Sequence, residues 1–324
     1  MAVSTAPAQR TVEDGSVSLT RPSRRRSSWR TRSELTFLLG PSVVLFLGFV
    51  LAPIGVAVYY SFYSYHGFGP LTDYVGLRNY RAALSDPAFQ HSITHNLAIG
   101  GLSLVVQLPL SVGLALLLNR RMRGRTFLRL VVFAPYVLAE AIVAVIWALM
   151  LQPDGFLDQV LKAAGLGGLV SDWLGSKSLV LYTLFVVITW KYIGFGIILL
   201  LAGLQGIPSE LREAAIIDGA TAWQSTRLVM LPLLGPTIRI WIFLSMIGSL
   251  QLFDLVWIMT LGGPADASST MATYMFSHGF QRYSYGYGSA VTVVLFVICF
   301  IFALLYQRFA LRRDTAGALT RAAG

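Results

Sequence analysis

Three ionisable side chains lie inside apolar stretches of this sequence, where charge is rare. They are Glu140, Lys191 and Asp254, each in a different stretch. An ionisable group within a lipid bilayer is costly and marks a functional site by default. These three groups would suit a proton relay. Glu140 and Lys191 both lie near the middle of their stretches, so a mutually neutralising pair is the alternative.

Aromatic side chains beside Lys191 suit a different chemistry. At 100° per residue, Lys191, Tyr192 and Phe195 fall within about one third of a helix circumference. Sugars are neutral and rich in hydroxyls, and proteins hold them in concave sites by aromatic stacking and hydrogen bonds. The aromatic stripe therefore indicates a sugar platform, with ordinary helix packing as the alternative.

Two serines extend this pattern in a later stretch. Ser245 and Ser249 are four residues apart and share one helix face, whereas Gln251 and Asp254 lie on nearly the opposite face. The serine hydroxyls could bind a polar substrate. The alternative is that these small residues let two helices approach closely.

These side chains must be positioned by helices that cross a bilayer. Only 12% of the 324 residues are charged, against about 25% in soluble domains. A helix needs about 20 apolar residues to cross about 30 Å of hydrocarbon. Six stretches have this length, at about 36–58, 96–118, 128–152, 178–202, 237–260 and 289–310. The sequence predicts an all-α membrane protein with six transmembrane helices.

Positive charge is divided unequally about the six spans. Nineteen of the 25 Lys and Arg residues flank one side, five flank the other, and Lys191 lies within a span. Lys and Arg accumulate in cytoplasmic loops. Both termini and the segment between the fourth and fifth spans are therefore predicted to be cytoplasmic. The net charge of +10 is assigned to the membrane surface, and no nucleic acid is expected.

The spans divide the chain into three parts. Residues 1–35 are polar and Arg-rich. This composition predicts a disordered cytoplasmic tail. The triplet Arg24–Arg26 resembles the start of an export signal, but a long apolar run and five more spans follow, so we predict a retained helix. Residues 36–310 form the transmembrane domain, and 311–324 form a cytoplasmic C-terminal tail.

Metal and disulfide chemistry have little basis in this sequence. Cys299 is the single cysteine, which excludes a disulfide within the chain. His91 and His95 are four apart, but two imidazoles without a third ligand rarely form a metal site. We expect no metal and no cofactor bound by this chain itself.

The predicted cytoplasmic segment at about 208–236 is unusually polar. From residue 210 it reads ELREAAIIDGATAWQSTRLVMLPLLGP. Ser209 suits the N-cap of a helix that runs to about Asp218, where Gly219 would end it. Thr221 and Gln224 have the spacing of a capping box, which would start a second helix. We predict two short helices separated by a bend.

This segment resembles the EAA loop of bacterial ABC importer permeases, through Glu213-Ala214-Ala215, Asp218-Gly219-Ala220 and Leu231-Pro232. In that family the loop is a coupling helix that docks in a groove of a cytoplasmic ATPase. The resemblance therefore implies a coupling role for Glu213, Ala214, Ala215, Asp218, Gly219 and Ala220. Thr226 departs from the family, which often has an aromatic residue there.

ATP hydrolysis would take place outside this chain. The sequence has no phosphate-cradling G-x-x-x-x-G-K-[ST] motif, so no catalytic residue is expected, and ATP and Mg would be bound by a partner ATPase. The resemblance implies a bacterial plasma membrane assembly. Its other members would be a second permease subunit, two ATP-binding subunits and an extracytoplasmic substrate-binding protein.

Further segments resemble the sugar-importing, maltose-type (MalF-like) branch of these permeases. They are Pro135-Tyr136, Trp147, Phe253-Asp254-Leu255, Thr260, Gly262-Gly263-Pro264, Ser269-Thr270 and Tyr287-Gly288-Ser289-Ala290. The resemblance covers about residues 35–310 and implies import of a sugar of di- or oligosaccharide size. Ala139 and Asp158 depart from it, because the family often has Pro and Asn there.

The branch also implies substrate contacts on the fourth and fifth spans. Carried onto this sequence, they fall near Ile188, Tyr192, Phe195, Ser245, Gly248, Ser249 and Leu252. Lys191 and Asp254 complete the predicted substrate-binding set as intramembrane charges. The outer segment 262–288 carries Tyr274, Tyr283, Tyr285 and Tyr287, which would contact the binding protein or form an interfacial aromatic belt.

Three other functions fit parts of the pattern. A proton-coupled secondary transporter would use the three intramembrane charges but would have no use for an ATPase-docking loop. An ABC permease for another solute, such as glycerol phosphate, would want more than the one buried cation, Lys191. A non-transporting scaffold or sensor would not need an intact coupling loop.

Overall fold

Helices make up the fold of this protein. The computed structural model describes residues 29–120 and 122–311. The predicted tail segments at 1–28 and 312–324 lie outside the described residues. Within the described ranges the only β-structure is an isolated bridge between Tyr63 and Tyr74. This confirms the predicted all-α fold.

The chain divides into two units, residues 1–53 and 54–324. The first contains α1 (Trp29–Phe46) and the π-helical segment η1 (Leu47–Leu51), which lead into α2 (Ala52–Ser61). The stretch Phe37–Ser61 is long and apolar enough to cross a membrane. Helix already begins at Trp29, within the segment 1–35 that was predicted to be a disordered tail. Polar residues at a membrane surface can continue the backbone hydrogen bonding of a span.

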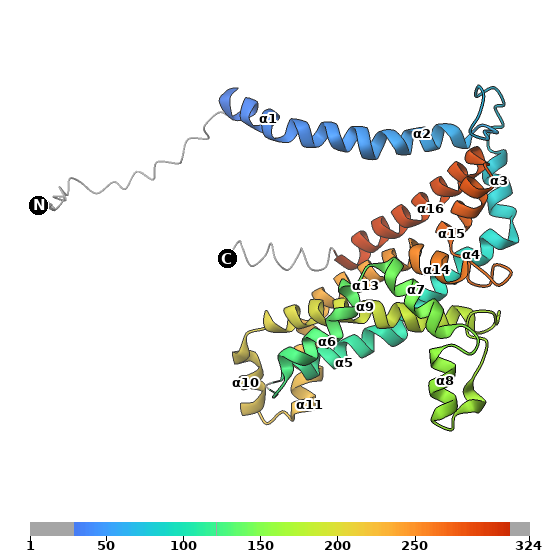
Figure 1. The fold of residues 1–324 in the computed structure, drawn as a ribbon. Coiled ribbons are helices and arrows are strands. Elements are labelled where there is room, and N and C mark those ends of the chain that lie inside the picture. The colour runs from blue at the N-terminus through green and yellow to red at the C-terminus, as the bar shows by residue number, and fades with distance from the viewer. Residues whose placement is uncertain (1–28, 121, 312–324) are drawn as a thin grey trace, which may run out of the picture. The chain divides into compact units, whose positions relative to one another are not determined.

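Three further straight helices of sufficient length lie in the second unit (Figure 1). The first is continuous through α4 (Pro87–Leu102), the π-helical segment η2 (Ser103–Gln107) and α5 (Leu108–Asn119). The others are α9 (Val180–Gln205) and α16 (Tyr285–Tyr306), the latter extended by η6 (Gln307–Leu311). Asp86 starts α4 by accepting a hydrogen bond from the Ala88 N–H at 2.8 Å, with Pro87 at the first helical position.

Two more candidate spans are bent. Helices α6 (Arg125–Val137) and α7 (Glu140–Leu151) meet at 95°. The segments α11 (Ala222–Gln224), η4 (Ser225–Met230) and α12 (Leu231–Leu233) meet α13 (Gly235–Leu250) at 63°. Six spans result if each bent pair is one span, which is the predicted number.

The predicted spans at 128–152 and 237–260 are not continuous helices. Leu138 and Ala139 are extended and interrupt the first. The second ends at Leu250, and a separate helix, α14 (Asp254–Thr260), follows. Hydropathy does not show either break, because side chains from other helices take up the freed carbonyl groups. Asn96 donates to Ser249 O at 2.5 Å, and Thr270 donates to Leu252 O at 2.7 Å.

Short helices connect the long ones in the second unit. They are α3 (Arg78–Ser85), α8 (Phe156–Ala163), η3 (Gly167–Leu169), α10 (Ser209–Ile217), α15 (Met271–Met275) and η5 (Phe276–Gln281). The segment with α8 precedes α9 and the segment with α10 follows it, so the two lie at opposite ends of α9 (Figure 1). Because α9 has 26 residues, these two segments are separated by a helix about 39 Å long.

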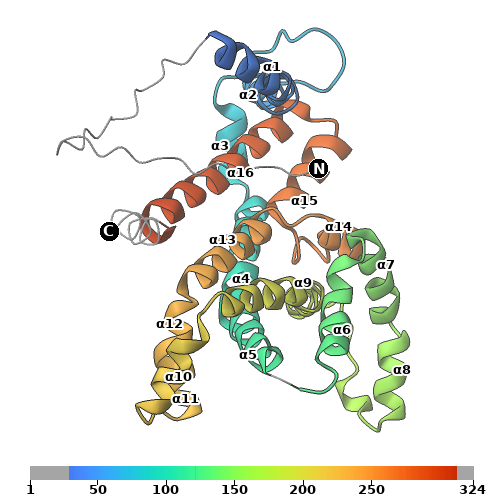
Figure 2. The ribbon, with the colours of Figure 1, turned by 90° about the vertical axis from the view of Figure 1, so that its left-hand side faces the viewer.

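Helix α9 is the centre of this unit, between α4–α5 on one side and α6 on the other (Figure 2). It contributes Leu184 and Ile188 to one buried apolar cluster and Ile197 and Leu200 to another. Gly194 sets its distance from α6, because a Cβ there would collide with the Val132 carbonyl oxygen and lie 3.0 Å from Phe133 Cα. The α6–α9 contact thus requires glycine at this position.

Candidate functional site

A cavity of about 310 Å³ opens beside α9. Helices α4, α6, α9 and α13 and the π-helical segment η2 form its wall. Seven lining residues are those that the family resemblance placed on the substrate path, namely Ile188, Tyr192, Phe195, Ser245, Gly248, Ser249 and Leu252. The structure therefore brings all seven together around one space.

Six further lining residues were not predicted from the sequence. They are Ile99, Ser103, Gln107, Tyr136, Trp241 and Leu244. The Tyr136 ring stacks on Phe195 with 5.1 Å between ring centroids, and it meets Tyr192 edge-on at 6.2 Å. The polar i, i+4 pair Ser103 and Gln107, in an otherwise apolar stretch, was the available sequence signal for the contribution of the second span.

Lys191, which was predicted to bind substrate, is not among the residues that line the cavity. Its side chain is 3% exposed. The ammonium group donates hydrogen bonds to Tyr136 O at 3.1 Å, to Pro135 O at 3.3 Å and to Leu138 O. These carbonyl groups lose their helical partners where α6 ends. Lys191 thus caps a broken helix, and its hydrogen bonds go to backbone oxygens rather than to Glu140.

Asp254 also lies outside the cavity lining. It is the first residue of α14, and Glu140 is the first residue of α7, so each carboxyl group lies at a helix N-terminus. The two side chains interact with one another across the α7–α14 contact. The predicted substrate contact by Asp254 therefore stays a prediction, and Asp254 is not part of the cavity wall.

The segment from α10 to α11 has the predicted two-helix form. Asp218 ends α10, and Gly219 has a φ of +84°. The Gly219 N–H donates to Ile216 O at 3.0 Å, and the Ala220 N–H donates to Ala215 O at 2.9 Å. These two bonds form a Schellman motif, which favours glycine at the left-handed position.

The second helix of this segment starts at a capping box. Thr221 Oγ1 accepts from the Gln224 N–H at 3.3 Å, and Gln224 Oε1 accepts from the Thr221 N–H at 2.8 Å. Ser209, which was predicted to be the N-cap of α10, does not occupy that position. Pro208 takes that position without a capping side chain, and Ser209 is the first helical residue.

The surface of the α10–α11 segment is open to solvent. Glu213, Ala214, Asp218 and Gly219 are exposed, and Ala215 and Ala220 are partly buried. Beside them lie two large apolar side chains, with Ile217 85% exposed and Trp223 66% exposed. Small residues, two carboxylates and uncovered apolar groups form a surface on which another protein can dock.

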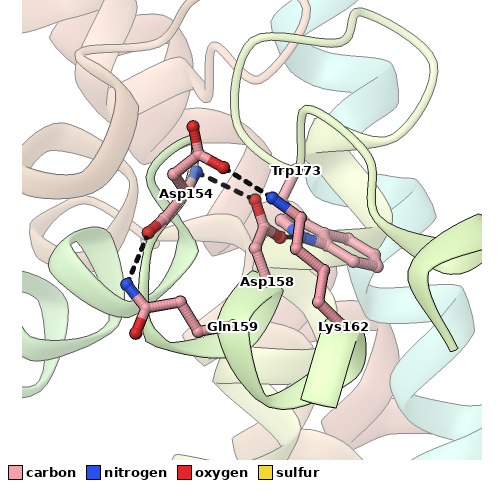
Figure 3. A network of polar contacts seen from close by, with 5 residues as sticks. All are labelled: Asp154, Asp158, Gln159, Lys162 and Trp173. Atoms are coloured by element: carbon pink, nitrogen blue, oxygen red, sulfur yellow. Dashed lines mark hydrogen bonds and ion pairs between the residues drawn. The ribbon is translucent and has the colours of Figure 1, made fainter. Parts of the chain in front are cut away.

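A polar network stabilises the α8 segment, at the other end of α9 (Figure 3). Asp158 is 3% exposed and accepts from Trp173 Nε1 at 2.9 Å and from the Asp154 N–H at 3.0 Å. Lys162 forms an ion pair with Asp154 at 2.6 Å. The hydrogen bond from Lys162 lowers the pKa of Asp154 below its ordinary value. Asp158, where the family often has Asn, thus accepts two hydrogen bonds.

The four tyrosines of the 262–288 segment have different environments. Tyr274 is buried, donates to Asp86 Oδ2 at 2.7 Å and bonds Tyr287 Oη at 2.8 Å. Burial and these two hydrogen bonds raise the pKa of Tyr274. Tyr285 is partly buried, and Tyr283 is 59% exposed. Tyr274 is therefore a packing residue, and only Tyr283 fully presents its ring to a partner or to lipid.

The chain belongs to the family of inner membrane components of binding-protein-dependent transport systems, whose model matches residues 107–315. It is 32% identical to the trehalose/maltose transport system permease protein MalF of Thermococcus litoralis, over 85% of this chain and 92% of the relative. It is also 32% identical to the diacetylchitobiose uptake system permease protein NgcF of Streptomyces coelicolor, over 92% and 87% of the two chains.

Another relative is named for an anionic solute. The sn-glycerol-3-phosphate transport system permease protein UgpA of Brucella suis is 31% identical, over 86% of this chain and 94% of the relative. A solved bacterial alginate ABC transporter, in complex with a pentasaccharide-bound periplasmic protein, matches the fold with a TM-score of 0.77 at 24% identity. That match covers 89% of this chain and 98% of the other. The predicted permease family and multi-pass membrane architecture are confirmed.

Proposed function

We propose that this chain is a transmembrane permease subunit of an ATP-driven sugar importer. The observation that carries the proposal is the cavity beside α9. Its wall combines the aromatic rings of Tyr136, Tyr192, Phe195 and Trp241 with serine and glutamine side chains. Stacking surfaces and uncharged hydrogen-bonding groups are what a sugar requires. The transport systems named for trehalose/maltose and diacetylchitobiose support this substrate class.

The α10–α11 segment is proposed to be the coupling surface. Glu213 and Asp218 are exposed carboxylates that an arginine of a partner could bind, and Ala214, Ala215 and Ala220 allow close backbone approach. The partner would be one of two ATPase subunits, which bind ATP and Mg. A second permease subunit would complete the translocation path, and an extracytoplasmic binding protein would deliver the sugar.

Orientation follows from this assignment and from the distribution of positive charge. The α10–α11 segment would face the cytoplasm with both termini, and the α8 segment would face the other side of a bacterial plasma membrane. The cavity would then lie between the coupling surface and the side from which the sugar arrives.

Helix α9 supplies the mechanical connection. Only three residues separate its last residue, Gln205, from the start of α10 at Ser209. Tyr192 and Phe195 lie 10–13 residues before that end, or about 15–20 Å along the helix. When ATP binding closes the ATPases, a displacement of α10 would be carried along α9 to the cavity wall. The cavity would thereby switch from inward-facing to outward-facing.

The experiment that tests this function is uptake of labelled mono- and disaccharides into cells that contain the whole importer. Wild type is compared with Glu213→Ala and Asp218→Ala, and Glu210→Ala, on the same helix, is the control. We expect one sugar to enter, both coupling variants to reduce its uptake at normal membrane levels, and the control to resemble wild type. Uptake that is insensitive to the coupling variants but collapses with a protonophore would overturn the proposal.

A further inference from the structure

Two polar side chains of the second span remain unsatisfied at the cavity. Gln107 is 4% exposed and Ser103 is 2% exposed, and both line the cavity. Neither side chain has a hydrogen-bond partner among the described residues, and neither is among their fully sealed unpaired polar groups. Their polar atoms are therefore open to the cavity. A buried amide that no protein group satisfies is therefore available to hydrogen-bond a polar ligand that enters the cavity.

The local backbone presents this pair to the cavity. Ser103 and Gln107 are the first and last residues of η2, the π-helical segment between α4 and α5. Such π-helical segments interrupt α-helices frequently at functional sites. The serine pair on α13 differs, because Ser249 already donates to Ser245 O at 2.9 Å. Gln107 therefore offers the cavity the larger unused hydrogen-bonding capacity.

The cavity wall carries no charge. None of its lining residues is an Asp, Glu, Lys or Arg, and the nearby Lys191 ammonium is occupied by three backbone carbonyl groups. A phosphate or carboxylate entering this cavity would lose its hydration without gaining a cation. Sugar hydroxyls would not, because each hydroxyl both donates and accepts.

We infer that Gln107, with Ser103 beside it, is a specificity-determining residue that selects an uncharged, hydroxyl-rich substrate. The Gln107 amide offers an acceptor oxygen and a donor nitrogen side by side, and so it matches two neighbouring hydroxyls of a sugar ring. An anionic group only accepts, and it would face the amide oxygen without a partner. This inference rests on the proposed sugar importer and names its substrate class.

The test uses the complete importer in proteoliposomes, with saturating binding protein, and measures uptake and ATP hydrolysis together. The probes are maltose, trehalose, diacetylchitobiose and sn-glycerol 3-phosphate. Gln107→Leu removes the amide, and Ser103→Ala is a smaller change in the same segment. Gln90→Leu is the matched control, because Gln90 is an exposed glutamine of α4 that donates to Leu84 O.

We expect wild type to take up a neutral sugar and not glycerol 3-phosphate. Gln107→Leu should lower sugar uptake about tenfold, which corresponds to one lost hydrogen bond, and ATP hydrolysis should stay unchanged. Ser103→Ala should lower uptake about threefold, and Gln90→Leu should have no effect. A folding or assembly defect would instead reduce uptake and ATP hydrolysis in parallel.

The outcomes separate this inference from the proposed function. Normal sugar uptake by Gln107→Leu overturns the role of the amide and leaves the sugar importer standing. Uptake of glycerol 3-phosphate at the rate of the neutral sugars overturns the selection for uncharged substrate. If wild type moves none of the neutral sugars, the proposed function fails, and the inference fails with it.

Discussion

The two segments at the ends of α9 differ in how their side chains are satisfied. In the α8 segment the buried Asp158 carboxylate accepts from Trp173 and from the backbone, and Lys162 pairs with Asp154. In the α10–α11 segment the hydrogen bonds are made by backbone and caps, whereas Ile217 and Trp223 are uncovered. The polar groups of the α8 segment form hydrogen bonds with one another. The α10–α11 segment instead leaves apolar side chains exposed, where another protein can cover them. Changes at the first should therefore cost stability, and changes at the second should cost coupling.

The largest expected effect is the loss of ATPase binding at the α10–α11 segment. Ile217→Asp places a charge at an exposed apolar group beside the proposed coupling residues, where we expect contact with the ATPase. A central apolar contact is worth about 2 kcal/mol or more, so ATP-driven transport should fall at least about 30-fold. The melting temperature of the isolated chain in detergent should not change, because Ile217 is exposed. Unchanged transport by this variant would show that Ile217 lies outside the interface.

The next effect is a loss of stability at the α8 segment. Asp158→Leu leaves Trp173 Nε1 and the Asp154 N–H without an acceptor, which should cost about 2–3 kcal/mol. Asp158→Asn keeps one acceptor oxygen and should cost about 1 kcal/mol. Thermal unfolding in detergent measures both values. Equal melting temperatures for the two variants would contradict the role of the second hydrogen bond.

A smaller effect is expected at the bend between α10 and α11. Gly219→Ala forces a Cβ into the left-handed conformation, which should cost about 1 kcal/mol locally. Hydrogen exchange of residues 214–220 should become faster, while exchange in α8 stays the same. Gly168→Ala is the control, because Gly168 has no positive φ and a Cβ added there would meet no atom within 4 Å. Identical exchange in the two variants would argue against a strained bend.

The smallest effect concerns the exposed ion pair of the α8 segment. Lys162→Ala should not change the melting temperature measurably at neutral pH, because exposed pairs contribute little. The pKa of Asp154 is lowered in the folded protein, so any contribution is present above the ordinary carboxyl pKa and disappears as pH falls through the lowered value. Melting curves of wild type and variant should therefore converge in acid. A difference in melting temperature between wild type and variant that grows as pH falls would contradict this pH dependence.

The comparison also shows which features could be predicted from sequence. The α10–α11 bend was predictable, because Gly219, Thr221 and Gln224 act on backbone groups within a few residues. The break between α6 and α7 was not predictable. The carbonyl groups that it frees accept hydrogen bonds from Lys191, which lies more than 50 residues away in the sequence. Gln107 was missed because its sequence signal, the i, i+4 spacing from Ser103, does not show whether the two side chains face a cavity or another helix. Its lack of a partner is visible only once the surrounding helices are in place.

The position of Lys191 has a consequence for how the cavity can open. Its ammonium fastens the end of α6 to α9, and Gly194 brings the same two helices into backbone contact one turn further on. Separating the two helices would leave a buried ammonium group and three carbonyl groups without hydrogen-bond partners. We therefore expect the Tyr136 wall of the cavity to move together with α9. Opening would then take place at the walls formed by α13 and by the second span, where no such buried charge among the described residues joins the helices.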